Sequence, residues 1–144
     1  MDGKLKSLVS QVFTEFNETN GFELKISSEK GFIEFESELF TVKLERYRDE
    51  LYVYLYKYGS DEINLFNLVN YLHQGTLSEV RSNYFRREEY IESRWKSQAR
   101  YIVEVLNKNF EEIRKFYRAR DYHQLVKDVE AFVVRSNPDL FQKG

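Results

Sequence analysis

The sequence contains no cysteine, one proline and only six glycines in 144 residues. Without cysteine the chain cannot form a disulfide, a thiolate metal site or a cysteine nucleophile. Its two histidines, His73 and His123, lie fifty residues apart in the sequence. A zinc site would therefore need mostly carboxylate ligands, so we predict no metal and no other cofactor.

Linear catalytic motifs are also missing. No G-x-S-x-G, P-loop or G-x-G-x-x-G pattern occurs, and neither histidine belongs to a motif with two histidines four residues apart around a glutamate. We therefore predict no catalytic residue and a protein that is not an enzyme. A site assembled only in three dimensions needs no linear motif, so an enzyme stays open as an alternative.

The sequence has no long apolar run, and Met1-Asp2-Gly3-Lys4 lacks the apolar core of a signal peptide. These two absences predict a cytoplasmic protein with no membrane partner. Export by a route without a cleaved signal stays open.

Aromatic residues are abundant, at 17% of a chain that is 42% hydrophobic. Twelve Phe and eleven Tyr indicate an interior filled by large rings, and Tyr can also serve a binding surface. The length fits a single domain over 1–144, and no repeat or flexible linker divides it.

The most regular stretch runs from Glu88 to Arg118 and predicts one long amphipathic helix. Its apolar residues recur every three or four positions, which draws a single stripe along a helix of 3.6 residues per turn. The stripe consists of Ile91, Trp95, Ala99, Ile102, Leu106, Phe110, Ile113 and Tyr117. We expect the rest of the domain to pack along this helix.

The remaining patterns complete an α+β fold. Apolar spacing predicts an N-terminal helix over 4–18, a short helix over 62–73 capped by Asp61, and a last helix from about 122 that ends before Asn137-Pro138. Between 22 and 58 the period changes to two, and short connections imply a four-stranded antiparallel meander. The break between the second and third strands near Ser37-Glu38 lacks the usual turn residues. Whether 77–87 join the long helix is left undecided.

Four tyrosines alternate with aliphatic residues along the fourth strand: Tyr52, Tyr54, Tyr56 and Tyr58. One interpretation is a central strand with both faces buried under helical layers. The other is an exposed aromatic strip that contacts a partner or stacked bases.

An acidic row precedes the tyrosines, since Glu34, Glu36 and Glu38 are expected on one face of the second strand. Such a row is typical of an ordinary exposed sheet face. It also suits an acidic patch that meets a basic protein, because charge steers the encounter while aromatic rings supply contact energy. We therefore predict a protein-binding site at Glu34, Glu36, Glu38, Tyr52, Tyr54 and Tyr56.

A basic segment is the alternative site. Residues 81–120 carry eleven bases and six acids, whereas 22–50 carry eight acids and five bases. Phosphates could be contacted by Arg81, Arg86, Arg87, Arg94 and Arg100. Interleaved glutamates would pair with several of these arginines, and no nucleic-acid-binding motif accompanies them.

The composition and the two surfaces favour a binding protein. In general character the chain is similar to immunity or antitoxin proteins, which block a toxin; this implies a protein partner such as a basic toxin or nuclease, and bacterial origin. The alternative is a nucleic-acid-binding accessory protein that uses the 81–100 segment. The oligomeric state is not predicted.

Overall fold

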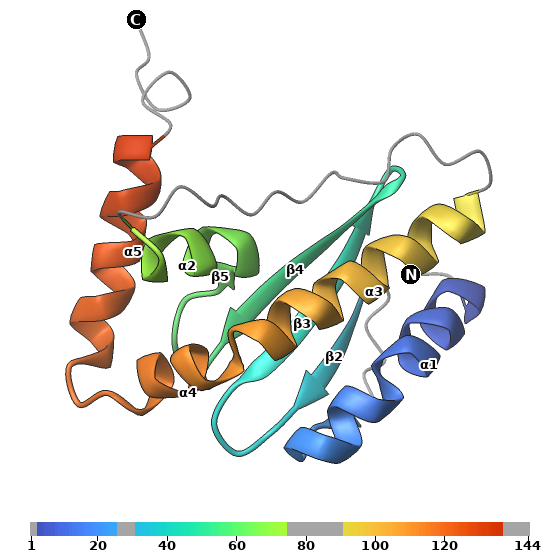
Figure 1. The fold of residues 1–144 in the computed structure, drawn as a ribbon, viewed down its shortest axis with the longest axis horizontal. Helices are drawn as coiled ribbons and strands as arrows, with labels where there is room; N and C mark the ends of the chain where they lie inside the picture. The colour runs from blue at the N-terminus through green and yellow to red at the C-terminus, as the bar shows by residue number, and fades with distance from the viewer. Residues whose placement is uncertain (1–2, 26–30, 75–90, 137–144) are drawn as a thin grey trace, which may run out of the picture.

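The computed structural model describes residues 3–25, 31–74 and 91–136. These ranges form an α+β fold, as the sequence predicts (Figure 1). The elements in chain order are α1 (Gly3–Asn20), β1 (Glu23–Lys25), β2 (Phe32–Glu36), β3 (Thr41–Tyr47), β4 (Glu50–Tyr56), β5 (Ile63–Asn64), α2 (Leu65–Leu72), α3 (Ile91–Lys108), α4 (Phe110–Arg118) and α5 (Tyr122–Ser136). The predicted start of the long helix at Glu88, and the undecided 77–87, lie outside the described residues.

The sheet is an antiparallel meander in which every strand pairs with its neighbour in sequence. It has five strands where the sequence predicts four. The fifth, β5, is two residues long and pairs with Tyr54 and Leu55 of β4, so it is too short to show an alternating pattern. The helix predicted from Glu62 consequently begins later. Asn64, and not Asp61, caps α2: its Oδ1 accepts hydrogen bonds from Phe66 N (2.9 Å) and Asn67 N (3.2 Å).

Ser37 stabilises the turn between β2 and β3, where the sequence lacks the usual turn residues. Ser37 Oγ donates a hydrogen bond to Phe40 O at 2.7 Å and accepts one from Phe40 N at 3.3 Å. A side-chain hydroxyl that binds nearby backbone groups in this way can stabilise a turn without Gly or Asn.

The core lies between one face of the sheet and the helices. The buried residues of the sheet alternate along the strands, and they include Ile33, Val42, Leu44, Val53 and Leu55. α1 and α3 lie side by side over this face, and α5 contacts α2 and α4 at the other side of the domain (Figure 1). Aromatic rings fill much of the interior, as the composition predicts: the rings of Phe13 and Phe35 stack at 4.8 Å, and those of Phe40 and Tyr117 at 5.0 Å.

The predicted long helix is two helices. Its stripe is core as expected, because Trp95, Ala99, Ile102, Leu106, Ile113 and Tyr117 are buried. The helix is interrupted at Asn109, however, which is 3% exposed and has backbone angles of −112° and 11°. The Asn109 side-chain amide donates to Val105 O at 2.8 Å. An asparagine that bonds the backbone locally competes with the regular helical pattern, and this gives the break a physical reason.

Candidate protein-binding face

The second face of the sheet, which we call the outer face, carries the polar alternating residues. The described helices lie on the opposite side of the sheet, so none of them covers this face (Figure 1). Tyr52, Tyr54 and Tyr56 are half-buried on it. In the described part of the chain, the interpretation with a second helical layer over the tyrosines is therefore not the observed arrangement. Tyr58 lies beyond the end of β4 and is 98% exposed.

The strand register brings the predicted carboxylates and tyrosines together across β3. Glu34 pairs with Lys43, which in turn pairs with Tyr54. In the next row Glu36 pairs with Thr41, and Thr41 pairs with Tyr56. With neighbouring strands about 4.8 Å apart, the backbones of β2 and β4 are roughly 10 Å apart, a distance that long side chains can span.

Glu38 does not belong to this face. β2 ends at Glu36, and Glu38 is exposed in the turn between β2 and β3. The prediction that three glutamates share one strand face is wrong at this residue. The Ser37 turn ends the strand before the alternation can reach it.

Glu34 is buried, with only 6% of its surface exposed. The hydroxyl of Tyr56 donates a hydrogen bond to its carboxylate Oε2. Burial, together with the hydrogen bond and charge of Glu34, raises the pKa of Tyr56 to about 12. Glu34 is therefore a structural acceptor that positions Tyr56, and Glu36 is the more accessible carboxylate of the pair.

Lys43 is the centre of a second polar cluster, which the sequence analysis missed. Its Nζ lies 2.9 Å from Glu45 Oε1 and 2.8 Å from Glu62 Oε1, and 4.6 Å from the centre of the Phe32 ring. Burial alone would lower the pKa of Lys43, but the two hydrogen-bonded carboxylates raise it. Alternation along β3 already placed Lys43 and Glu45 outward. Glu62, however, reaches the cluster only because β5 folds back along β4.

The outer face has an excess of negative charge. Its described charged residues in and beside the strands are six carboxylates, two lysines and one arginine, namely Glu23, Glu34, Glu36, Glu45, Glu50, Glu62, Lys25, Lys43 and Arg48. Arg48 belongs to this set because its guanidinium lies 5.4 Å from the centre of the Tyr47 ring. Both lysines are already paired: Lys43 as above, and Lys25 with Glu36 at 3.7 Å. A net charge of minus three therefore remains on the outer face without an opposite charge among the described residues.

The tyrosines of the outer face are held in place but remain partly accessible. The rings of Tyr47 and Tyr52 lie 6.2 Å apart, and Tyr47 is 57% exposed. Burial, and then neighbouring carboxylates, raise the pKa of Tyr52 and of Tyr54, so both phenols are neutral at physiological pH. Neutral, oriented rings of this kind contribute contact area at a low entropic cost.

The predicted basic site is only partly described. Arg81, Arg86 and Arg87 lie outside the described residues. Arg94 is engaged by Asp49, whose Oδ2 is 3.1 Å from Arg94 Nη1, and Arg100 is exposed. Six residues is about 1.7 turns of a helix, so Arg94 and Arg100 lie on different sides of α3. Arg94 and Arg100 therefore do not form one patch.

The two histidines have different neighbours. His73 Nε2 is 3.3 Å from the Glu112 carboxylate, and His123 is exposed beside Tyr122. Within ranges 3–25, 31–74 and 91–136, no group of three or more His, Asp and Glu side chains could hold a metal ion.

Each helix in the described ranges is too short or too polar to cross a membrane. The chain matches no protein-family model, and neither the curated proteins nor the solved structures contain a significant match to it.

Proposed function

We propose that this chain is a non-enzymatic binding protein whose outer face docks a basic partner protein. The observation that carries the proposal is the excess of carboxylates beside three half-exposed tyrosines, on a sheet face that no described helix covers. Inhibition of a toxin or nuclease, in the manner of immunity or antitoxin proteins, is the role that fits such a face best.

The charge of the face suits a basic partner. An acidic surface raises the association rate of a positively charged protein, and salt suppresses that effect because the Debye length is about 8 Å at physiological ionic strength. A nuclease cleft is basic because it binds phosphates, so it is the kind of surface this face would occlude.

The tyrosines suit the binding step itself. Tyr is enriched among the residues that contribute most to interface energy, since it combines a large ring with a hydroxyl. Tyr56 is oriented by Glu34 and Tyr54 lies beside Lys43, so the rings lose little further freedom when a partner binds.

The test begins with affinity capture from the native host, using the full chain as bait. The captured partner is then purified, and its association and dissociation rates are measured between about 50 and 300 mM salt, a range in which screening changes strongly. The double variant Glu23→Gln/Glu36→Gln removes two exposed charges from the outer face. Its matched control, Glu15→Gln/Glu18→Gln, removes two exposed charges from α1.

The outer-face double variant should associate more slowly and show a flatter salt dependence, and the α1 variant should behave as the native chain. Tyr54→Ala should act on dissociation and weaken binding by about 2 kcal/mol or more. The partner's own activity should fall when the native chain is added. If the α1 variant slows association as much as the outer-face variant, or Tyr54→Ala leaves dissociation unchanged, the outer face is not the binding site.

A further inference from the structure

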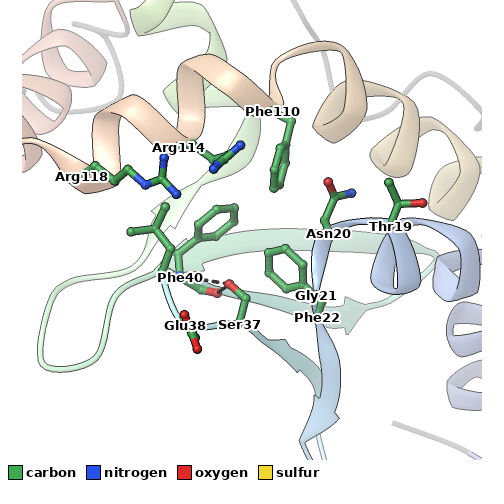
Figure 2. Close-up of a pocket in the computed structure, with 11 residues that line it drawn as sticks. Thr19, Asn20, Gly21, Phe22, Ser37, Glu38, Phe40, Phe110, Arg114 and Arg118 are labelled. Carbon is green, nitrogen blue, oxygen red and sulfur yellow. Dashed lines mark hydrogen bonds between the residues drawn. The ribbon is translucent and has the colours of Figure 1, made fainter.

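A hollow of about 640 Å³ opens on the domain, at the end of α4. Three segments that are distant in sequence surround it: the end of α1 with the residues after it, the β2–β3 turn, and one side of α4 (Figure 2). Its lining consists of Thr19, Asn20, Gly21, Phe22, Ser37, Glu38, Leu39, Phe40, Phe110, Arg114 and Arg118. A volume of this size is typical of sites for small organic molecules.

Three phenylalanine rings form the apolar part of the hollow. The ring of Phe22 lies 5.2 Å from that of Phe40 and 6.3 Å from that of Phe110, and the last two are 6.1 Å apart. Phe22 and Phe40 are buried, while Phe110 is half-buried. A ligand in the hollow would therefore contact mainly the Phe110 ring and the edges of the other two.

Two guanidinium groups lie at the rim. Phe110, Arg114 and Arg118 are spaced by four residues, so they share one side of α4. Figure 2 shows both arginine side chains extending along the same side of the hollow, whereas the Glu38 carboxylate points away from it. Arg114 is paired with Glu111 at 2.8 Å. Arg118 is exposed and makes no hydrogen bond or ion pair with another described residue.

A cation in the last turn of a helix is favoured by the helix dipole alone. One turn earlier on the same side, Arg114 is held by its ion pair with Glu111 and lies 5.8 Å from the centre of the Phe110 ring. Arg118 has no such partner among the described residues, so an anion at the rim would receive from it the charge-assisted hydrogen bonds for which Arg is suited.

We propose that this hollow binds a small organic anion with an apolar body, such as an aromatic carboxylate. The carboxylate would lie against Arg118 and Arg114, and the apolar body would lie on Phe110. The site is separate from the outer face, so this proposal does not depend on the partner protein proposed above.

The test uses two probes of the same shape and different charge, 1-naphthoate and neutral 1-naphthylmethanol. Each is titrated into the ¹⁵N-labelled full chain while amide chemical shifts are recorded, which also shows that every variant is folded. Arg118→Gln is compared with Arg120→Gln, which removes another exposed guanidinium that does not line the hollow. Acetate, at matched ionic strength, tests the contribution of the apolar body.

Naphthoate should shift the amides of Gly21, Ser37 and Phe110, and Arg118→Gln should weaken its binding about tenfold, as expected for a lost charge-assisted hydrogen bond. Arg120→Gln should bind naphthoate as the native chain does, and naphthylmethanol and acetate should each bind more weakly than naphthoate. The proposal is overturned if naphthoate does not bind, if its shifts lie elsewhere, or if Arg120→Gln weakens binding equally. It is also overturned if naphthylmethanol binds as tightly as naphthoate, because the charge would then be irrelevant. Equally tight binding of acetate would overturn it too, because the apolar body would then be irrelevant.

Discussion

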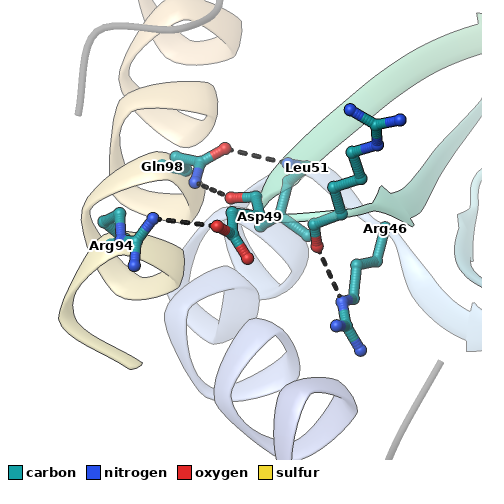
Figure 3. Close-up of polar contacts among 6 residues, drawn as sticks. Arg46, Asp49, Leu51, Arg94 and Gln98 are labelled. Atoms are coloured by element: carbon teal, nitrogen blue, oxygen red, sulfur yellow. Dashed lines mark hydrogen bonds and ion pairs between the residues drawn. The ribbon is translucent and has the colours of Figure 1, made fainter. Parts of the chain in front are cut away.

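Gln98 connects α3 to the turn between β3 and β4 through two hydrogen bonds. Its side-chain oxygen accepts a hydrogen bond from Leu51 N at 2.8 Å, and its side-chain nitrogen donates to Asp49 O at 2.9 Å (Figure 3). Gln98 is only 6% exposed. It therefore satisfies the buried backbone N–H of Leu51 and the partly buried carbonyl of Asp49 at the start of β4. One turn earlier, Arg94 holds the Asp49 carboxylate from the same side of α3.

We predict that Gln98→Met destabilises the domain by about 2–4 kcal/mol. Met preserves the length of the side chain, so little packing is lost. The lost hydrogen bond to Asp49 O contributes about 0.5–1.5 kcal/mol, and the buried Leu51 N–H left without a partner costs about 1–3 kcal/mol. Since domains are stable by only about 5–15 kcal/mol, this loss is a large share of the total.

The free energy of unfolding is measured by urea denaturation, followed by far-ultraviolet circular dichroism. Hydrogen exchange at the Leu51 amide gives the local reading, and it should become faster relative to the amides of β3. Arg94→Ala is the comparison, because its ion pair involves an Asp49 side chain that is 56% exposed. That variant should cost less than about 1 kcal/mol. If Gln98→Met changes the stability by less than about 0.5 kcal/mol, which is usual for a surface substitution, and leaves Leu51 equally protected, the reasoning is refuted.

Three further predictions concern single residues. Trp95 is 6% exposed, so Trp95→Ala should cost about 3–5 kcal/mol in urea denaturation, and native emission resembling that of free tryptophan would contradict its burial. The pKa of Tyr56 is raised to about 12 in the folded chain, whereas in the unfolded chain this phenol ionises near pH 10. The contribution of the neutral phenol to the free energy of unfolding is therefore complete below about pH 10 and is lost as the pH rises toward 12. Tyr56→Phe should therefore flatten the alkaline decline of the unfolding free energy, and an unchanged slope would show that Tyr56 is not held by Glu34. Asn64→Ala removes the cap of α2 and should cost about 1 kcal/mol by the same denaturation assay, whereas no loss would mean that the cap contributes nothing.

The alternation of residues along the strands was readable from the sequence. Side chains at successive positions of a strand point to opposite faces, so a period of two assigns Val53 and Leu55 to one face and Tyr54 and Tyr56 to the other. The structure confirms this assignment, with the aliphatic residues in the core and the tyrosines on the outer face. The spacing of three and four likewise identified the buried stripe of α3 and α4, because the helical period does not depend on what the helix packs against.

Two local features escaped the pattern because they depend on single side chains. The stripe runs through Asn109 without a change in period. The buried hydrogen bond from the Asn109 side-chain amide to Val105 O lies at the point where α3 ends and α4 begins. Ser37 ends β2 by bonding Phe40, which removes Glu38 from the strand. Hydrogen bonds of this kind are decided by the geometry of the backbone around one residue, and apolar spacing does not record them.

The pairing of charges across the sheet was decided by the tertiary structure alone. The sequence shows that Glu34, Lys43 and Tyr56 are polar positions of strands, but their partners depend on register, which the strand pairing sets. That pairing places Tyr56 one row away from Glu34, where its hydroxyl reaches the carboxylate. It also brings Glu62 to Lys43 through β5, a two-residue strand with no pattern of its own. The hollow beside α4 is a similar case, because it joins residues about 20, 40 and 114 in the sequence. Composition and periodicity act over a few residues, whereas both sites form only where separate elements meet.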